Sequence, residues 1–259
     1  MPPMRSAIVT GAAQGIGRRV AEVLGGEGCA LVLCDLREPA ETLEALGAAG
    51  VAALAVVGDL AEEATAMTAA QTAVEAFGGI DVLVNNAGVS HIAPAEEIAT
   101  ADWRRVIDVN LTGAFVLSRE AGRSMLARRG GSIVNVASIA GLHGIAERAA
   151  YNASKHGLVG LTRTLAAEWG GRGVRCNAVC PSWVKTEMDV ADQEGGGYTD
   201  ADIAGRNPMG RFASPDDIAQ AVAFLADPAR SGFVNGQTLA VDGGWLADAS
   251  WDSLRARQR

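Results

Sequence analysis

The stretch from residue 10 to residue 17 decides the fold and reads Thr10-Gly11-Ala12-Ala13-Gln14-Gly15-Ile16-Gly17. The apolar run 6–10 leads into it, and an amphipathic helical pattern follows it. A glycine-rich turn between a strand and a helix lets backbone N–H groups at the helix start approach a pyrophosphate. We therefore predict a dinucleotide-binding loop. In it, Gly11 makes the turn, Gly15 allows the close approach, and Gly17 lets helix and strand pack together.

Apolar, β-branched runs alternate with helical patterns along the rest of the chain. We predict seven strands, over 6–10, 30–34, 53–57, 81–85, 132–136, 174–179 and 238–241. We predict helices over 16–24, 61–77, 101–129, 151–170 and 215–226. Nearly continuous apolar runs are typical of parallel strands covered on both faces. The expected fold is therefore α/β, a doubly wound, seven-stranded parallel sheet of the Rossmann-like kind, in a single domain spanning 1–259.

Two segments depart from this alternation. The region of about 188–212 carries Gly195-Gly196-Gly197 and is predicted to be a mobile substrate loop between the sixth strand and the next helix. The tail 247–259 continues past the last strand and carries Trp251 and three arginines. We expect this tail either to reach a neighbouring subunit or to be disordered.

Composition excludes several classes of function. The 259 residues are 49% hydrophobic and 20% charged, which is enough apolar material for a sizeable core. With 22 Lys and Arg against 30 Asp and Glu, the formal net charge is −8. An acidic chain without a basic run is a poor binder of nucleic acid or anionic membrane, so we expect neither partner. No apolar stretch approaches the roughly 20 residues that span a bilayer.

The cysteines and the first residues indicate the compartment. Cys29, Cys34, Cys176 and Cys180 show no C-x-x-C pairing, so we expect free thiols, no metal site and no disulfide framework. Residues 1–6 lack the long apolar stretch of a secretory signal. The expected location is the cytoplasm.

The acid at the end of the second strand bears on the choice of dinucleotide. Asp35 lies 24 residues after Gly11, where a carboxylate accepts hydrogen bonds from the adenosine ribose and repels a 2′-phosphate. This favours NAD as the cofactor, with NADP less favoured. Arg37 leaves NADP open, because a nearby arginine can bind that phosphate. In the alternative interpretation, Asp35 merely begins a loop or caps the helix that starts near Pro39.

The strongest chemical signal is Ser138 followed by Tyr151 and Lys155, which share one helical face four residues apart. A neighbouring ammonium lowers the pKa of a phenol, and an oxidised nicotinamide adds a second positive charge. A downward shift of about 3 units corresponds to about 4 kcal/mol. Tyr151 is then predicted to exchange a proton with an alcohol or carbonyl oxygen that Ser138 also binds. Asn110, inside a helical stretch, is predicted to hold a water that relays protons to Lys155, through its side chain or a local kink.

With these residues, the chain resembles the short-chain dehydrogenase/reductase family, of the compact single-domain kind, from about residue 5 to residue 246. The motifs that carry the resemblance are Thr10-Gly11-x-x-x-Gly15-Ile16-Gly17, Asp59-Leu60, Asn85-Asn86-Ala87-Gly88, Asn110, Ser138, Tyr151-x-x-x-Lys155 and Val241-Asp242-Gly243-Gly244. The resemblance implies a catalytic tetrad of Asn110, Ser138, Tyr151 and Lys155.

The same resemblance implies a set of cofactor-binding residues. They are Gly11, Gln14, Gly15, Ile16, Gly17, Asp35, Asp59, Leu60, Asn86, Tyr151, Lys155, Val184 and Thr186. Within this set, Asp59 and Leu60 would contact adenine, and the Val184 backbone with the Thr186 hydroxyl would hold the nicotinamide carboxamide. Ser182 stands where the family usually has Gly, so its Cβ either narrows the nicotinamide pocket or is tolerated. The family is usually tetrameric, which implies a homotetramer paired through the helices of Asn110 and Tyr151.

The predicted function is an NAD-dependent oxidoreductase that interconverts a secondary alcohol and a ketone on a small polar molecule such as a polyol, sugar or hydroxy acid. The first alternative is an NADPH-linked 3-oxoacyl-thioester reductase, which Asp35 disfavours. The second is a non-catalytic NAD-sensing protein, which the Ser138, Tyr151 and Lys155 set disfavours.

The remaining candidates carry weaker predictions. His156 is interpreted as structural, and His91 and His143 as surface residues or substrate contacts. Four large side chains are predicted to line either an apolar pocket or a packed lid; they are Trp183, Met188, Tyr198 and Met209.

Overall fold

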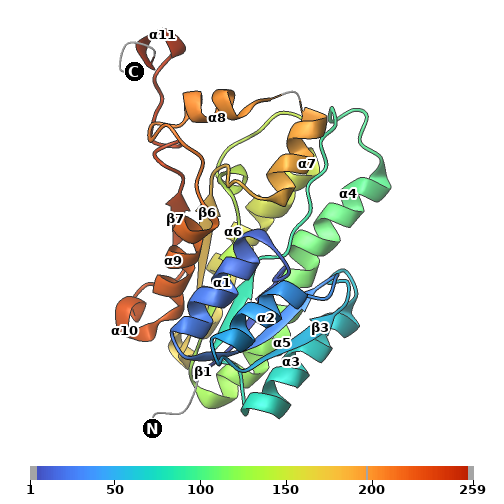
Figure 1. Ribbon diagram of the computed structural model, residues 1–259, viewed down its shortest axis with the longest axis vertical. Coiled ribbons are helices and arrows are strands. Elements are labelled where there is room, and N and C mark those ends of the chain that lie inside the picture. The colour runs from blue at the N-terminus through green and yellow to red at the C-terminus, as the bar shows by residue number, and fades with distance from the viewer. Residues whose placement is uncertain (1–4, 197, 256–259) are drawn as a thin grey trace.

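The computed structural model describes residues 5–196 and 198–255, and its centre is a parallel sheet of seven strands in the order β3-β2-β1-β4-β5-β6-β7 (Figure 1). The strands are β1 Arg5–Thr10, β2 Cys29–Asp35, β3 Ala53–Val57, β4 Val82–Asn85, β5 Gly131–Val136, β6 Val174–Pro181 and β7 Thr238–Val241. Every predicted strand is present, and each pair of neighbours is parallel. The predicted fold class is confirmed.

Helices cover both faces of the sheet, as the continuous apolar runs of the strands require. They are α1 Gly15–Gly26, α2 Ala40–Ala48, α3 Glu63–Phe77, α4 Thr100–Ile107, α5 Gly113–Arg128, α6 Ala149–Trp169, α7 Glu187–Gly196, α8 Asp200–Arg206, α9 Pro215–Ala226, α10 Pro228–Ser231 and α11 Asp252–Arg255. Val20 of α1 and Ile218 of α9 belong to the core on one face. Leu117 of α5 and Leu165 of α6 belong to the core on the other.

The predicted helix over 101–129 is interrupted. Between α4 and α5 the chain forms a π-helix over Asp108–Thr112, with Asn110 at its centre. A Cβ on Gly113, just after it, would lie 2.4 Å from the backbone oxygen of Leu60. π-Helical turns are found mostly at functional sites, and here the turn carries the local kink predicted for Asn110.

The segment predicted as a mobile insertion is largely helical. It contains most of α7 and all of α8, which lie above the carboxyl ends of the strands in Figure 1. Thr199 caps α8 by accepting a hydrogen bond from the backbone N–H of Asp202, whose side chain binds back to Thr199. This capping box is a sequence signal for a helix start that the glycine run next to it obscured.

The chain changes direction between β1 and β4, which are neighbours in the sheet although β2 and β3 intervene in sequence. In open α/β sheets the crevice at such a switch point, outside the carboxyl ends of the strands, is where ligands bind. The topology therefore places the loop after β1 at the expected binding crevice.

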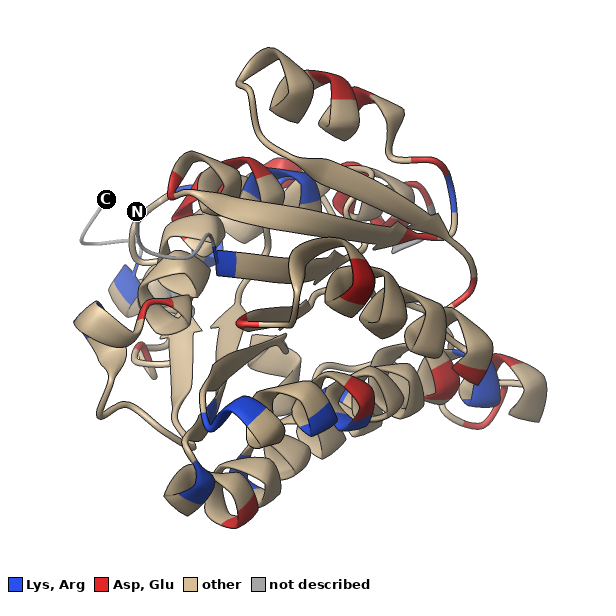
Figure 2. Ribbon diagram, turned by 90° about the horizontal axis from the view of Figure 1, so that it is seen from below, with Lys and Arg blue, Asp and Glu red and all other residues tan. Residues whose placement is uncertain are grey.

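Other sequence expectations concern charge, thiols and the tail. Figure 2 shows segments of both charge signs along several helices. All four cysteines are buried free thiols, as predicted. Within residues 5–196 and 198–255, no helix is long and apolar enough to cross a membrane. The tail forms the short helix α11, and its last four residues, 256–259, lie outside the described part of the chain.

Candidate active site

A cavity of about 390 Å³ lies at the carboxyl edge of the sheet, between the loop after β1 and helix α7. It gathers most of the predicted site residues, namely Gly11, Gln14, Gly15, Ile16, Asp35, Asp59, Leu60, Asn86, Ser138, Tyr151, Lys155, Val184 and Thr186. Gly17 and Asn110 are not among the residues that line it. The residues chosen from sequence are therefore brought together around one space.

The glycine-rich loop has the backbone geometry predicted for it. Gly11 and Gly15 have φ angles of 65° and 55°, a region that side chains rarely adopt. A Cβ on Gly17 would lie only 2.0 Å from the backbone oxygen of Gly11. Each of the three positions therefore requires glycine, and α1 starts close against the loop with its N–H groups directed at the cavity.

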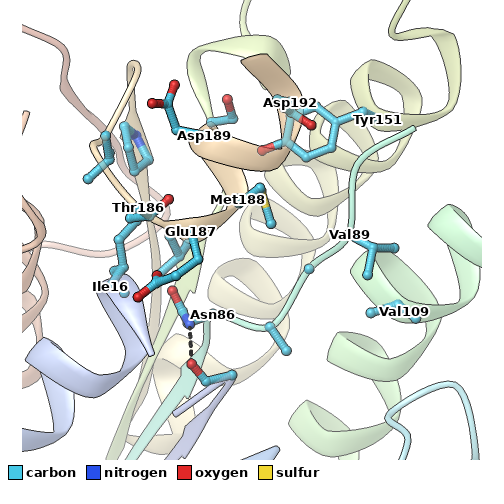
Figure 3. A pocket seen from close by; sticks show the side chains of 18 of the residues that line it. Ile16, Asn86, Val89, Val109, Tyr151, Thr186, Glu187, Met188, Asp189 and Asp192 are labelled. Carbon is cyan, nitrogen blue, oxygen red and sulfur yellow. Dashed lines mark hydrogen bonds between the residues drawn. The ribbon is translucent and has the colours of Figure 1, made fainter. Parts of the chain in front are cut away.

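Asn86, after β4, holds this loop in place. Its Nδ2 donates hydrogen bonds to the backbone oxygens of Thr10, at 2.9 Å, and Gly11, at 3.2 Å; one of these bonds is dashed in Figure 3. The Thr10 hydroxyl in turn accepts from the backbone N–H groups of Asn86 and Ala87. Asn86 thus acts on the loop itself, a role that its predicted contact with the cofactor did not include.

Asp35 ends β2 at the cavity and is linked to the same loop. Its Oδ2 accepts a hydrogen bond from the backbone N–H of Ala13 at 2.9 Å, and its Oδ1 accepts from the backbone N–H of Arg37 at 3.2 Å. The Arg37 guanidinium donates to Gln14 Oε1. Asp35 therefore lines the cavity as well as bonding to the loop that follows β2, so the alternative in which it merely begins a loop describes only part of its position.

Asn110 ties the chain after β4 to α6. Its Oδ1 accepts from the backbone N–H of Val89 at 2.8 Å, and its Nδ2 donates to the Val89 oxygen at 3.0 Å and to Ser154 Oγ at 3.1 Å. A Cβ on Gly88 would lie 3.3 Å from Asn110 Oδ1 and 3.6 Å from Lys155 Nζ. Gly88 therefore lies close to both the amide of Asn110 and the ammonium of Lys155, and the relay water between them stays a prediction.

Tyr151 and Lys155 lie in the first turns of α6, and Ser138 follows β5. Lys155 Nζ is 5.5 Å from the centre of the Tyr151 ring and donates a 2.9 Å hydrogen bond to the backbone oxygen of Val136. Burial lowers the pKa of Lys155 to about 8. The ammonium is therefore anchored to β5 and held beside the phenol.

The pKa of Tyr151 departs from the sequence prediction. Burial raises it above its ordinary value, and this effect exceeds the lowering by the hydrogen bond with Ser138 and by the charge of Arg148. The protein by itself therefore does not show the downward shift, which was predicted with the positive charge of a bound nicotinamide included. The spacing of Tyr151 and Lys155 shows that they are neighbours but does not show how deeply the phenol is buried.

Helix α7 closes the cavity on the side of Tyr151 and contributes Met188, Asp189 and Asp192 (Figure 3). Asp192 Oδ2 accepts a 2.6 Å hydrogen bond from Arg148, three residues before Tyr151. Asp189 Oδ1 accepts from the hydroxyl of Tyr198 at 3.2 Å. This end of the cavity is polar, and sequence reasoning missed both carboxylates and the arginine.

The comparisons with known proteins agree with this geometry. A family model described as enoyl-(acyl carrier protein) reductase matches residues 11–246. The chain belongs to the short-chain dehydrogenase/reductase family. It is therefore an NAD(P)-dependent oxidoreductase acting on CH–OH groups, and the alternative of a non-catalytic NAD-sensing protein is wrong.

Two curated relatives and one solved structure illustrate the similarity. D-threitol dehydrogenase of Mycolicibacterium smegmatis is 43% identical over 92% of both chains. Cis-4-hydroxycyclohexanecarboxylate dehydrogenase of Sinomonas cyclohexanicum is 43% identical over 94% of this chain and 97% of its own. A putative NAD(P)-dependent gluconate 5-dehydrogenase from Beutenbergia cavernae, solved with NADP at low occupancy, is 44% identical with a TM-score of 0.88, covering 94% and 97% of the two chains.

In this short-chain dehydrogenase/reductase, Ser182 is tolerated without backbone strain. Among the described non-glycine residues, only Arg129 and Glu147 have a positive φ, so Ser182 does not need the freedom of glycine. Its hydroxyl oxygen is buried without a hydrogen-bond partner, in a residue that lines the cavity. An unpartnered polar atom there fits a polar ligand group, such as a carboxamide, next to Val184 and Thr186.

The large side chains and histidines singled out in the sequence differ in whether they line the cavity. Trp183, Met188 and Tyr198 line the cavity, whereas Met209 is 65% exposed and does not. His91 and His143 are not among the lining residues. His156 is exposed, with its Nδ1 2.9 Å from the backbone oxygen of Asn152. These results favour the interpretation of the histidines as residues outside the catalytic site.

Proposed function

We propose that the protein interconverts a secondary alcohol and a ketone on a small polar substrate, a polyol, sugar or hydroxy acid, with NAD as the hydride carrier. One observation carries the proposal. Tyr151, Ser138 and Lys155 meet at one end of a cavity whose other end is the glycine-rich loop. A dinucleotide bound along this cavity would have its phosphates at the loop and its nicotinamide beside Tyr151.

The residues present fit such a cofactor. Gly17 keeps the helix start close to the loop, and Ser182 offers an unpartnered oxygen at the opposite end. Asp59 and Leu60 would contact adenine, and Val184 and Thr186 the carboxamide. When bound, the oxidised cofactor supplies a hydride acceptor and a positive charge.

The chain's own residues handle the proton. The Tyr151 hydroxyl takes the proton of the alcohol or returns it to the ketone, and Ser138 holds the same substrate oxygen by a hydrogen bond. Because burial raises the pKa of Tyr151 in the protein alone, deprotonation requires further positive charge nearby. Lys155 supplies part of that charge, and Asn110, which lies close to it at Gly88, would hold the water that relays protons to Lys155.

Asp35 supports NAD rather than NADP. Its carboxylate lines the cavity, where a ribose 2′-phosphate would meet a negative charge. The neighbouring Arg37 also lines the cavity and its guanidinium donates to Gln14 Oε1, so the support for NAD comes from the carboxylate of Asp35. A thioester reductase using NADPH is correspondingly disfavoured, although two solved relatives were obtained with NADP.

The relatives support a small hydroxylated substrate. Their printed names include a threitol dehydrogenase, a galactitol 2-dehydrogenase (L-tagatose-forming) from Cereibacter sphaeroides and a hydroxycyclohexanecarboxylate dehydrogenase. These compounds share a secondary alcohol on a compact polar carbon framework. We extend that substrate class to this chain.

Assembly and location are part of the proposal. Trp103 of α4 and Phe115 of α5 are 37% and 43% exposed, and apolar side chains of this size on neighbouring helices support subunit pairing along that face. We propose a homotetramer on this basis. The four unpaired thiols support a reducing, cytoplasmic environment.

The direct test is a substrate screen with the purified full-length chain. NAD reduction is followed with polyols, sugars and hydroxy acids, and NADPH oxidation with ketones and 3-oxoacyl thioesters. We expect NAD-linked oxidation of at least one small hydroxylated compound. Activity confined to NADPH and a thioester would overturn the proposal, as would the absence of turnover with every compound.

A further inference from the structure

The cavity beside Tyr151 has an unusual charge arrangement. Two carboxylates of α7 line it at this end, Asp189 and Asp192, while Glu187 of the same helix lies closer to the glycine-rich loop. Two cations line the same end, Arg148 and Lys155. Asp192 pairs with Arg148 and Asp189 pairs with Lys185, so the charges of these two carboxylates are balanced by their neighbours and the surroundings of the substrate suit a neutral molecule.

Neither cation is arranged to receive an anionic substrate. Arg148 donates to Asp192 at 2.6 Å and to Ser90 Oγ at 2.8 Å, and its side chain is only 11% exposed. Lys155 is 3% exposed and donates to the backbone oxygen of Val136. A substrate carboxylate at this end would compete with Asp192 for Arg148 and would lie close to the negative charges of Asp189 and Asp192.

The carboxylates are arranged as hydrogen-bond acceptors. Asp189 is 6% exposed, and its Oδ1 accepts from the Tyr198 hydroxyl while its Oδ2 lies 3.2 Å from Lys185 Nζ. Asp192 uses one oxygen for Arg148, and an ionised carboxylate has about four acceptor sites. Both residues therefore keep sites that match the hydroxyl donors of a polyhydroxylated molecule.

Asp192 also lies near the reacting group. Its negative charge raises the pKa of Tyr151, so the two interact electrostatically. Figure 3 shows Asp192 on the turn of α7 that faces Tyr151. A substrate oxygen bound to Tyr151 would therefore place the hydroxyl groups on neighbouring carbons within reach of α7.

We infer that the substrate is a neutral polyol rather than a hydroxy acid, and that Asp192 and Asp189 determine this specificity. The inference rests on the proposed function and narrows it. Asp192 acts twice, by accepting from a substrate hydroxyl and by neutralising Arg148, which would otherwise bind a carboxylate. Asp189 accepts from a more distant hydroxyl and positions Tyr198 in the wall.

The experiment compares neutral and anionic substrates of equal chain length. kcat and KM are measured for threitol and erythritol, xylitol, and galactitol, and for the aldonate of each, with saturating NAD. We expect kcat/KM for the preferred polyol to exceed that for its aldonate by at least about 100-fold. Equal or better use of the aldonate would overturn the inference while leaving the proposed function intact.

Two variants and a control separate specificity from folding. Asp192→Asn is expected to raise KM for the preferred polyol about tenfold and to increase kcat/KM for its aldonate about tenfold, because Arg148 is released. Asp189→Asn is expected to raise KM for the polyol alone. The control Asp216→Asn removes a carboxylate that pairs with Arg19 at 2.8 Å outside this cavity, and should leave the polyol-to-aldonate ratio unchanged.

The outcomes are distinguishable. A ratio unchanged by Asp192→Asn, with thermal unfolding confirming a folded variant, would overturn the role of Asp192. Preference for a monohydric alcohol such as cyclohexanol over every polyol would overturn the substrate class. If no alcohol at all is oxidised with NAD or NADP, the proposed function fails first and the inference fails with it.

Discussion

The two ends of the cavity are built by different kinds of contact. At the loop end, the backbone of Thr10 and Gly11 is held by Asn86, and Gly17 packs with no room for a Cβ. At the Tyr151 end, α7 is attached by contacts between side chains, including the ion pair of Arg148 and Asp192. Backbone contacts specify one geometry, whereas ion pairs between side chains can be exchanged without changing the fold. The glycine-rich loop is therefore the more rigidly specified end of the cavity, and the Tyr151 end is the one that side-chain substitutions can alter without disturbing the fold.

Glu187 stands between the two ends. It begins α7, and a Cβ on Gly15 would lie 3.3 Å from its Oε2, so the carboxylate reaches the glycine-rich loop. Figure 3 shows its side chain directed toward Ile16 and Asn86. A bound pyrophosphate would meet this charge, which couples the position of α7 to cofactor binding.

The largest effect is expected for the proton-transfer residue Tyr151, and it is compared with the effect of changing a second tyrosine in the cavity wall. Tyr151→Phe should lower kcat by about 10²–10⁴-fold with NAD affinity nearly intact, because the proton acceptor is lost. The only other tyrosine, Tyr198, supplies a matched control in the same cavity. Tyr198→Phe should change mainly the substrate KM, and kcat values that fall equally in both variants would contradict the division of roles. The measurement is steady-state kinetics with a cofactor-binding titration.

The second prediction concerns how much the burial of the Lys155 ammonium lowers the free energy of unfolding. The pKa of Lys155 is lowered to about 8 in the folded protein from 10.5, so the unfolded chain binds more protons between these values and stability rises with pH there. Below pH 8 the buried ammonium destabilises the folded protein by the full amount of about 3 kcal/mol. Lys155→Met should therefore be more stable relative to the native chain at pH 7 than at pH 10.5, by up to about 3 kcal/mol.

Denaturant unfolding at several pH values measures this difference. The matched control is Lys185→Met, because the pKa of that exposed lysine is raised by its hydrogen bond to Asp200. The raised pKa keeps Lys185 protonated in the folded state, and the ordinary pKa of 10.5 keeps it mostly protonated in the unfolded state up to about pH 9.5, so the control difference should stay flat from pH 7 to about 9.5, a range over which most of the Lys155 effect develops. A flat difference for Lys155→Met as well would show that the ammonium is solvated.

The third prediction concerns Asp35 and the preference for NAD over NADP at the loop end. Asp35→Ala should change the ratio of kcat/KM for NAD to that for NADP by about 10–100-fold toward NADP, because hydrogen bonds to a charged group contribute about 1.5–3 kcal/mol. Glu38→Ala removes an exposed acid three residues away and should leave the ratio unchanged. A ratio unaltered in both variants would mean that another residue reads the ribose.

The smallest expected effect lies at the junction of the two ends. Glu187→Gln should tighten NAD binding by about 2–5-fold, since one partly screened charge near the phosphates contributes up to about 1 kcal/mol. Glu194→Gln, on the exposed side of the same helix, is the matched control. Binding titrations at low and high salt would show the effect shrinking with ionic strength, and weaker binding of the Gln variant would contradict the repulsion.

The sequence predicted the loop end well because its signals are local. The spacing of Gly11, Gly15 and Gly17 specifies a turn, and continuous apolar runs specify buried parallel strands. Asn110 is a poor helix former in a stretch predicted to be helical, and in the structure the helix is interrupted by a π-helical turn at this residue. Membership of the family, suggested by motifs in order, was confirmed by the comparisons.

The Tyr151 end was harder to predict because its contacts are not local. Arg148 and Asp192 are 44 residues apart, and their pairing depends on where α7 lies. The glycine run at 195–197 indicated a loop, although the residues before it form a helix. The raised pKa of Tyr151 in the protein by itself could not be foreseen, because burial depends on the whole wall of the cavity, which residue spacing does not report.

The attachment of α7 by exchangeable ion pairs has a consequence for divergence. A single change at Asp189 or Asp192 alters which molecules are accepted while leaving the sheet, its core and the glycine-rich loop untouched. A duplicated copy of such a gene can acquire a new substrate through a few substitutions on one short helix. Its capacity to fold and to hold the dinucleotide is conserved meanwhile, so natural variation should concentrate on this helix.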